Sequence, residues 1–575
     1  MPEGKVASST LLRATPLLAL ALRAAADGTT ARVTVDTAVA YNSSDWSSSW
    51  VELESVRNIL GTMNGPREVY AFDDEHGAYD TAQYAASFDE LAPYAVRFND
   101  MNYLNGGYNS TSITQIFRAW PLTDAALSAL TASEIAALAS DDGNYVWEGV
   151  DYNVGGACAA GSVELMDFRV GDTYQVTNAL NKGEAVPMGG GNATTFPASW
   201  MFPTDVLTEN GIALWAAVAT RLATRVREKL CASQPKVVFD ILTEIYIDSE
   251  DEAHFWPHNA SVYARLYAAA AASIKAAVGD DGGVSLAGPN VLLSNSKNED
   301  FFTTFIEACH AMGYAACPLD VATFHYFSPD STKPTSMATW MQSAVWHEFH
   351  DDDGFDTPRL AITAFGLHGS GEYDYYGNVT GAALVTEHIV TLQGTPVDFC
   401  IFYKFDGGNC GDEEAPCLVQ AESGELKPNA EPFALHSRLL AAGGARLAAE
   451  LDACGSGGVA LAAYSGGDDP SLAIMLGGTG SQAPQNLVVL NAPCGSAGGV
   501  ALTTASVVVD EDGVGAISET TVAGSFSDGY FYEAGESDAY ELPIEVDANN
   551  GYFSALLTLS CVTRALPARA ADIYS

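Results

Sequence analysis

The chain has 575 residues, enough for three or four average domains or for one large barrel with a smaller domain. Hydrophobic residues make up 48% of it, which excludes a disordered chain. Its 72 acidic and 26 basic residues give a net charge of −46. Such a surface repels phosphate backbones and anionic lipid, so we expect no nucleic-acid or membrane-surface partner.

Residues 1–27 have the layout of a secretory signal peptide. Lys5 and Arg13 precede an apolar run, Pro16 to Leu22, and small residues follow. The run is too short to cross a bilayer, and no later segment reaches 18 uninterrupted apolar residues, so no membrane span is expected. We therefore predict a secreted protein or one in the lumen of the secretory pathway.

Cysteines and glycosylation sequons agree with that compartment. The ten cysteines are an even number, which suits disulfides in an oxidising environment. Two pairs, Cys309 with Cys317 and Cys410 with Cys417, bracket short loops that local disulfides could close. The N-x-S/T sequons stand at Asn42, Asn109, Asn192, Asn259 and Asn378. No CxxC or HxxxH spacing suggests zinc, and we expect neither a metal nor a cofactor.

Residues 28–435 alternate short apolar runs with helical stretches. The candidate strands are residues 31–40, 94–100, 162–168, 236–244, 283–290, 320–327, 359–366 and 398–407. Two helices are well marked: 205–230 has helical apolar spacing and basic last turns, and 261–279 is Ala-rich with Ser261 as its cap. Eight apolar strands alternating with helices predict a parallel sheet closed into a (β/α)₈ barrel.

Residues 436–575 have a different character. Strand-like runs at 472–478, 486–492, 499–510 and 552–562 are separated by Gly, Ser and Asp turns, with no strong helix among them. This pattern predicts an all-β domain, most simply a sandwich, with residues 441–451 as the hinge into it.

The barrel's chemistry is expected where its strands end, because active sites of such barrels lie at the carboxyl ends of the strands. These ends carry acidic, amide and aromatic groups, which suit a carbohydrate: rings stack on its apolar faces while polar groups hold its hydroxyls. Glu244 ends an apolar run beside aromatic residues, where a raised pKa would let it protonate a glycosidic oxygen. A structural role, pairing with an arginine, is the alternative. The candidate substrate-binding residues are Arg97, Asn99, Thr243, Tyr246, Trp256, His325, Tyr326 and Tyr403.

Residues 90–445 resemble glycoside hydrolase family 39, the β-xylosidase and α-L-iduronidase family of retaining (β/α)₈ enzymes. The similar segments, in order, are VRFND, IFRAWPLTDA with NYVWEGVDYNV, VELMDFRVG, ILTEIYIDSEDEAHFW, YARLYAAAAASIKAA, AGPN, DVATFHYFSPD and LAITAFG. The resemblance implies a glycosidase barrel that acts on xyloside- or uronide-like sugars. It also implies that Glu244 is the acid/base and that position 364 is that of the nucleophile.

The departures from that family concern the chemistry. Its acid/base strand ends in Asn-Glu, here Thr243-Glu244, and its nucleophile strand ends in Thr-Glu, here Thr363-Ala364. Asn99 stands where a His is common in the family. Retaining hydrolysis needs two carboxylates about 5–5.5 Å apart, and a methyl group can neither attack carbon nor stabilise an oxocarbenium ion. The replacement therefore puts hydrolysis in doubt.

Four interpretations remain open from the sequence. The protein is an inactive carbohydrate-binding or scaffold protein, or an active hydrolase whose carboxylate is relocated to Glu372 or Asp374. A third interpretation is that Ala364 replaces a natural Glu, against which Thr243 argues, since removing a nucleophile would not require it. A purely structural secreted adhesion protein is the fourth. The sugar, the linkage and the oligomeric state do not follow from the sequence.

Overall fold

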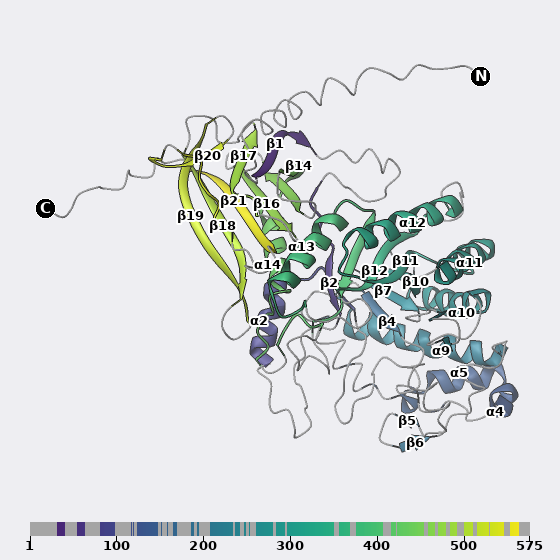
Figure 1. Ribbon diagram of the computed structural model, residues 1–575. Coiled ribbons are helices and arrows are strands. Elements are labelled where there is room, and N and C mark those ends of the chain that lie inside the picture. The colour runs from purple at the N-terminus through teal and green to yellow at the C-terminus, as the bar shows by residue number, and fades with distance from the viewer. Residues whose placement is uncertain are drawn as a thin grey trace, which may run out of the picture.

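The structure is a computed structural model. It describes residues 32–40, 55–63, 81–97, parts of 117–194, and most of 208–562. Residues 98–116, 242–246, 254–259, 350–355, 368–374 and 406–415 are among those outside the described residues. Two modules lie side by side: a helix-rich barrel and an all-β module (Figure 1). No described helix is both long enough and apolar enough to cross a membrane.

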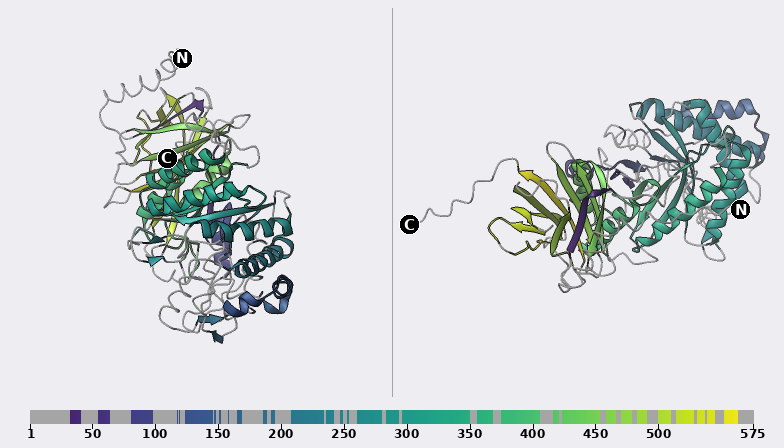
Figure 2. Two further views of the ribbon diagram at one scale, coloured as in Figure 1. Left: turned by 90° about the vertical axis from the view of Figure 1, so that its right-hand side faces the viewer. Right: turned by 90° about the horizontal axis from the view of Figure 1, so that it is seen from above.

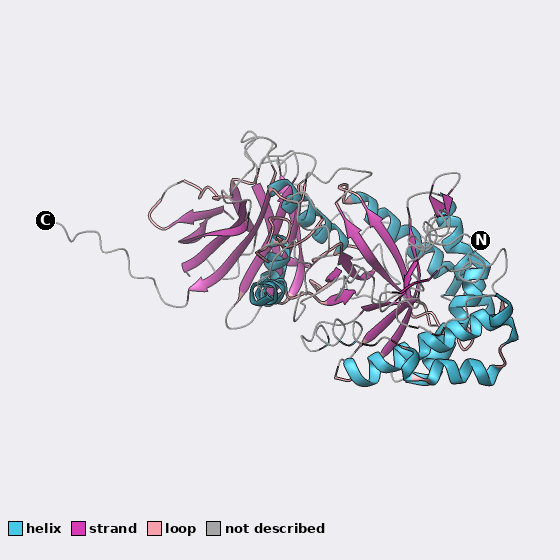
Figure 3. Ribbon diagram, turned by 90° about the horizontal axis from the view of Figure 1, so that it is seen from below, coloured by secondary structure: helices cyan, strands magenta, loops and turns pink. Residues whose placement is uncertain are grey.

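Eight parallel strands form the barrel sheet. Their order around it is β3-β2-β13-β12-β11-β10-β7-β4. In chain order they are β2 (Leu60–Met63), β3 (Ala95–Arg97), β4 (Leu165–Phe168), β7 (Val237–Ile241), β10 (Val284–Leu292), β11 (Val321–Phe327), β12 (Arg359–Gly366) and β13 (Val397–Phe402). Helices cover the outside of this sheet (Figure 3). The predicted (β/α)₈ architecture is confirmed, and residues 359–366 are its seventh strand.

The barrel helices lie between these strands in the chain, except α14, which follows the last strand. They are α2 (Thr81–Leu91), α4 (Asp124–Ala129), α5 (Ala132–Ser140), α9 (Glu209–Arg225), α10 (Ala260–Val278), α11 (Ser296–Met312), α12 (Thr332–Phe349), α13 (Val379–Leu392) and α14 (Glu431–Ala442). Both predicted helices are present, and α9 continues into a π-helical turn over Val226–Leu230. Ser261 is not the cap of α10 but lies inside it, since the helix begins at Ala260. Gly279, with φ +87°, follows its last residue.

The prediction that residues 31–40 form the first barrel strand was wrong. Residues 32–40 form β1 (Arg32–Ala40), which pairs antiparallel with β14 (Ala445–Asp452) and parallel with β17 (Asn486–Leu490) in the all-β module. The barrel instead begins with the four-residue β2. Gly61 is required there, because a Cβ would lie 2.3 Å from Ile401 Cδ1 and 2.6 Å from the Ala95 carbonyl oxygen.

The C-terminal module is all-β, as predicted, and its sheet closes on itself around one apolar core. Its order is β1-β14-β15-β16-β21-β18-β19-β20-β17. The further strands are β15 (Val459–Ser465), β16 (Ser471–Gly478), β18 (Gly499–Val509), β19 (Gly515–Ser527), β20 (Tyr530–Glu533) and β21 (Phe553–Val562). The expected hinge at 441–451 is largely strand β14, and the purple β1 lies among the green and yellow strands (Figures 1 and 2).

The two modules share a continuous core. Met475 on β16 and Leu556 on β21 belong to the same apolar cluster as the barrel helices α13 and α14. The hydroxyls of Thr386 on α13 and Ser554 lie 2.7 Å apart in a buried hydrogen bond. Gly477 permits this approach, because a Cβ there would lie 2.5 Å from the Thr386 methyl.

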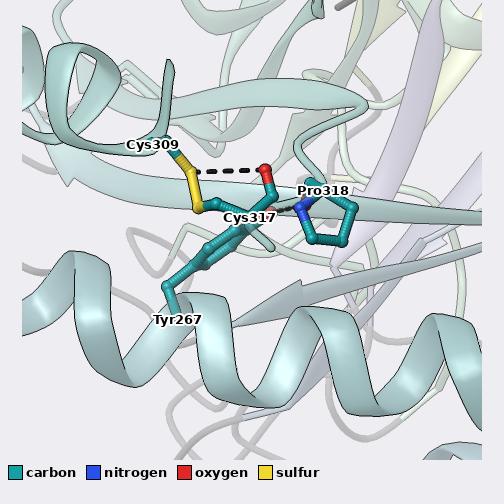
Figure 4. Close-up of a disulfide and its surroundings, with 4 residues drawn as sticks. All are labelled: Tyr267, Cys309, Cys317 and Pro318. Atoms are coloured by element: carbon teal, nitrogen blue, oxygen red, sulfur yellow. Dashed lines mark hydrogen bonds between the residues drawn. A yellow bond between two sulfur atoms is a disulfide. The ribbon is translucent and has the colours of Figure 1, made fainter. Parts of the chain in front are cut away.

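Two described disulfides join parts of the barrel. Cys309 and Cys317 are bonded, as their spacing predicted, and beside them Tyr267 Oη donates to the Pro318 carbonyl at 3.0 Å (Figure 4). Cys158 and Cys231 form the second, over a separation of 73 residues. Cys417 is also disulfide-bonded, and Cys410 lies outside the described residues. Cys400, on β13, is a buried free thiol.

Candidate functional site at the carboxyl end of the barrel strands

The barrel interior is built in layers of inward side chains. One interior cluster is apolar and is drawn from seven strands, namely Met63, Ala95, Val238, Ala287, Val321, Ala361, Ala364, Phe399 and Ile401. Because strand side chains alternate, Asp240 and Thr323 point inward two residues beyond Val238 and Val321. His325 follows two residues later at the end of β11. Polar side chains therefore join the apolar ones in the interior toward the carboxyl ends of the strands, where an active site is expected.

Two irregularities in strand pairing change this alternation. Between β10 and β11, Pro289 pairs with Thr323 and Val291 with Phe324, so Asn290 is an extra residue. Asn290 has φ +54°, a left-handed conformation that Asn tolerates better than most residues. A register shift of this kind turns the strand locally and re-aims a side chain, and such features concentrate near active sites.

The second irregularity lies at position 363. Between β11 and β12, Phe324 pairs with Ile362 and His325 with Ala364, so Thr363 is the extra residue. Ile362 and Phe365 belong to the core beneath the helices, whereas Ala364 belongs to the interior cluster. The shift therefore turns two successive residues, Thr363 and Ala364, into the barrel.

Hydrogen bonds connect these inward polar residues. Thr363 Oγ1 donates to Asn290 Oδ1 at 2.7 Å, and Asn290 Nδ2 donates to Asp240 Oδ2 at 2.6 Å. Thr323 Oγ1 accepts from the Asn290 backbone N–H at 3.1 Å and donates to Asp240 Oδ1 at 3.3 Å. All four side chains are fully buried. They form one polar layer across β7, β10, β11 and β12, which the sequence analysis did not predict.

The opposite wall of the barrel contributes Arg97, the last residue of β3. Its Nη1 donates to the Thr363 carbonyl oxygen at 2.7 Å, and the residue has no exposed surface. The strand shift at Thr363 is thus held through its hydroxyl by Asn290 and through its carbonyl by Arg97.

The predicted site residues divide into three groups. Arg97, His325 and Ala364 are fully buried near the ends of β3, β11 and β12. His325 pairs with Ala364 across the two strands, and Arg97 bonds the carbonyl of Thr363, the residue before Ala364. Tyr326 and Tyr403 are half-buried, and burial, followed by the nearby Asp330 carboxylate, raises the pKa of Tyr326. Asn99, Thr243, Glu244, Tyr246, Trp256, Glu372 and Asp374 lie outside the described residues.

Aromatic rings border Ala364 on the side of β11 and β13. Phe327 and Tyr403 pack on the interior cluster that contains Ala364, and their rings meet edge to face with centroids 5.7 Å apart. His325 meets Phe327 in the same way at 6.3 Å.

Known structures with the same architecture bear on this arrangement. A glucosidase from Croceicoccus marinus matches 93% of this chain and all of its own, with 15% identity and a TM-score of 0.56. The chain shares its fold with glycosidases. CelM2, a bifunctional glucanase-xylanase from a metagenome library, matches 93% of the chain and all of its own at 11% identity and a TM-score of 0.54.

A third match is the BuGH86 protein in complex with neoagarooctaose. It covers 93% of this chain and 79% of its own, at 11% identity and a TM-score of 0.55. No protein-family model matches the chain, and no curated protein matches it in sequence. At these identities the likeness concerns the fold, and the function has to be argued from the site.

Proposed function

We propose that the carboxyl end of the barrel is a carbohydrate site of glycosidase origin in which the retaining reaction has lost its nucleophile. The observation that carries this proposal is Ala364, which lies two residues before the end of the seventh strand and is turned into the barrel by the register shift at Thr363. The sharing of the glycosidase fold and the resemblance of 90–445 to family 39 support it.

The missing group decides the chemistry. In a retaining mechanism one carboxyl protonates the leaving oxygen and the other attacks carbon from about 5–5.5 Å away. We assign the first role to Glu244, and Ala364 has no atom for the second. Because each factor of ten in rate corresponds to about 1.4 kcal/mol of barrier, losing a nucleophile costs several such factors. The protein is then expected to bind a sugar without turning it over.

The burial of the candidate contacts separates their roles. Arg97 and His325 have no exposed surface, which favours holding the site in shape over direct contact with a sugar. Tyr403 keeps exposed surface after β13 and packs on the interior cluster, so it is the described candidate for stacking on a sugar ring. Tyr326 packs on the core beneath the helices, which argues against a direct contact with the sugar. Asn99, Thr243, Tyr246 and Trp256 remain proposed contacts. Family 39 points to xylosides and uronides as the first ligands to examine.

The decisive experiment restores the lost group. Wild type, Ala364→Glu and the isosteric control Ala364→Gln are assayed against aryl β-xylosides, β-glucosides and uronides. We expect turnover only from Ala364→Glu. Ala364→Gly with sodium formate or azide provides a second route, because a small anion can occupy the space of a missing carboxylate.

Other outcomes separate the alternatives. Rapid hydrolysis by wild type would contradict the proposal, and its loss in Glu372→Ala or Asp374→Ala would identify a relocated carboxylate. The structural adhesion protein would be favoured if no variant hydrolyses a glycoside and the wild type binds no glycan.

We further propose that the protein acts outside the cytosol. Its disulfides Cys158–Cys231 and Cys309–Cys317 suit an oxidising compartment. Finding the mature N-terminus near residue 28 on protein recovered from culture medium would support secretion, and recovery of intact protein from the cytosol alone would contradict it.

A further inference from the structure

The polar layer inside the barrel has an arrangement that a plain core would not need. Asp240, Thr323, Asn290 and Thr363 come from four neighbouring strands, and each makes a hydrogen bond to another member. Buried polar groups cost free energy unless they are paired, so an apolar layer would fill the same space with less demand on geometry. The polar layer fixes the orientation of the groups that it joins, because hydrogen bonds are directional and apolar contacts are not.

The polar layer fixes the orientation of the backbone at the register shift beside Ala364. The Asp240 carboxylate accepts from the Asn290 amide, which leaves Asn290 Oδ1 turned toward β12 to accept from the Thr363 hydroxyl. Asn290 is itself held in place because its backbone N–H donates to Thr323 Oγ1. The two extra residues, Asn290 on β10 and Thr363 on β12, are therefore linked directly to each other.

We infer that Asp240, Asn290 and Thr363 are positioning residues that hold the β12 shift and thereby set where the side chain of residue 364 enters the barrel. The proposal concerns the site of the proposed function but does not depend on which sugar it binds. Arg97 completes the arrangement by holding the Thr363 carbonyl from the opposite wall. In this view the site has kept the machinery that orients a group at position 364 although the group itself is now a methyl.

Thiol labelling tests this without any carbohydrate. Ala364→Cys places a small reporter at the site, and Cys400 provides a second, buried thiol on the neighbouring strand β13. Cys400 packs in the core beneath the helices, whereas Ala364 packs in the barrel interior. Alkylation of the two cysteines by iodoacetamide, followed by mass spectrometry of their peptides, therefore compares local loosening with global unfolding in one molecule.

The critical pair of variants tests the Thr363 hydroxyl. Thr363→Val keeps the shape but removes the hydroxyl that donates to Asn290 Oδ1, while Thr363→Ser keeps that hydroxyl. Losing a buried hydrogen bond is costly, so we expect Thr363→Val to raise the labelling rate of residue 364 at least tenfold and that of Cys400 less than twofold. Thr363→Ser should stay within about threefold of its parent. Asn290→Gly, which tolerates φ +54°, should behave like Thr363→Val.

A matched control removes a buried hydrogen bond elsewhere. Asn298 is fully buried at the start of α11, where its Nδ2 donates to the Leu292 carbonyl at 2.6 Å. Asn298→Ala should leave the ratio of the two labelling rates unchanged. Equal acceleration of both thiols by Thr363→Val, or no acceleration of residue 364, would overturn the proposal. If Ala364→Cys does not fold, amide hydrogen exchange of the β12 peptide in Thr363→Val and Thr363→Ser gives the same comparison.

An activity arm separates this inference from the proposed function. In the Ala364→Glu background, Thr363→Val should lower kcat for an aryl β-xyloside at least tenfold with KM within twofold, and Thr363→Ser should restore it. An equal loss in kcat from Thr363→Ser and Thr363→Val would overturn the role of the hydroxyl. Failure of Ala364→Glu to hydrolyse any glycoside would count against the proposed function alone, because the labelling result still decides the positioning role.

Discussion

Arg57 and Arg446 both donate to the carbonyl oxygen of Gln393, at 3.2 and 2.6 Å. Gln393 follows the last residue of α13, where backbone carbonyls have no partner within the helix and carry partial negative charge. Arg57 precedes the first barrel strand and Arg446 lies on β14, so one helix end joins the two modules. Burial, followed by the charge of Arg446, lowers the pKa of Arg57 to about 10.

We predict that the two arginines differ in their contribution to stability. Arg57 also donates to the carbonyls of Leu392, Thr395 and Val397, three contacts beyond the carbonyl that it shares with Arg446. Arg57→Met should therefore lower the free energy of unfolding by about 3–5 kcal/mol and Arg446→Met by about 1–3 kcal/mol. Urea unfolding of purified protein measures both.

Arg438 supplies the control. It pairs with Glu519 between α14 and β19, and both side chains are nearly half exposed. Such a pair is worth about 0–1 kcal/mol, so Arg438→Met should change little. An equal loss from Arg438→Met and Arg57→Met would show that the carbonyl contacts do not account for the effect.

Stability should also depend on Glu431 at neutral pH. Burial, followed by the nearby Glu90, raises its pKa from 4.5 to about 7, against the opposing charge of Arg438. The native state then binds more protons than the unfolded state between these two values, so the free energy of unfolding falls as pH rises from about 4.5 to about 7. Since one pKa unit corresponds to about 1.4 kcal/mol, the free energy of unfolding falls by an amount on the order of 3 kcal/mol over this range.

Glu431→Gln removes this titration. The variant should gain stability over wild type steadily from pH 4.5 to pH 7 and then keep a constant difference, as followed by urea unfolding at each pH. Glu425→Gln, at an exposed position, should track wild type throughout. Parallel curves for wild type and Glu431→Gln would contradict the prediction.

The two described disulfides should contribute unequally. Cys309–Cys317 spans 8 residues and Cys158–Cys231 spans 73. On the chain-entropy account, the first should stabilise by about 2–3 kcal/mol and the second by about 4–5 kcal/mol. Denaturant unfolding compares the double variants Cys309→Ala/Cys317→Ala and Cys158→Ala/Cys231→Ala. A larger loss of stability on removing the short-loop disulfide would contradict the prediction.

Removal of β1 should damage the all-β module rather than the barrel. Val33 and Val35 are fully buried in that module's core, and β1 pairs with both β14 and β17. Deleting residues 28–41 should therefore expose the edges of those two strands and increase hydrogen exchange there, with β10 to β12 protected as before. Deleting only residues 1–27 is the control, and increased exchange confined to the barrel would contradict the assignment.

Strong local patterns gave the best predictions of the fold. Residues 359–366 were predicted as a strand at the same bounds, because six apolar or Thr residues run between Arg359 and Gly366. The four-residue β2 offered no such run, since Leu60–Met63 contains a Gly that only the packing against Ile401 explains. Residues 31–40 were recognised as a strand, but a strand's pattern does not state which sheet it joins.

The polar layer was missed for a related reason. Which residues of β10 and β12 point inward depends on the register shifts at Asn290 and Thr363, and sequence spacing assumes a regular alternation. One signal was available: Asp240 interrupts an otherwise apolar run, VVFDIL, and a buried carboxylate needs partners.

The position of β1 also sets an order of events during synthesis. Its Arg32 pairs with Asp452, so this strand leaves the ribosome about 420 residues before its partner. At about 5–20 residues per second, that delay is on the order of 20–80 s. For that time β1 has no strand on either side, while the barrel sequence is being made. The first described strand is thus among the last to be paired, and the nascent chain carries an unpaired apolar segment that chaperones would be expected to cover.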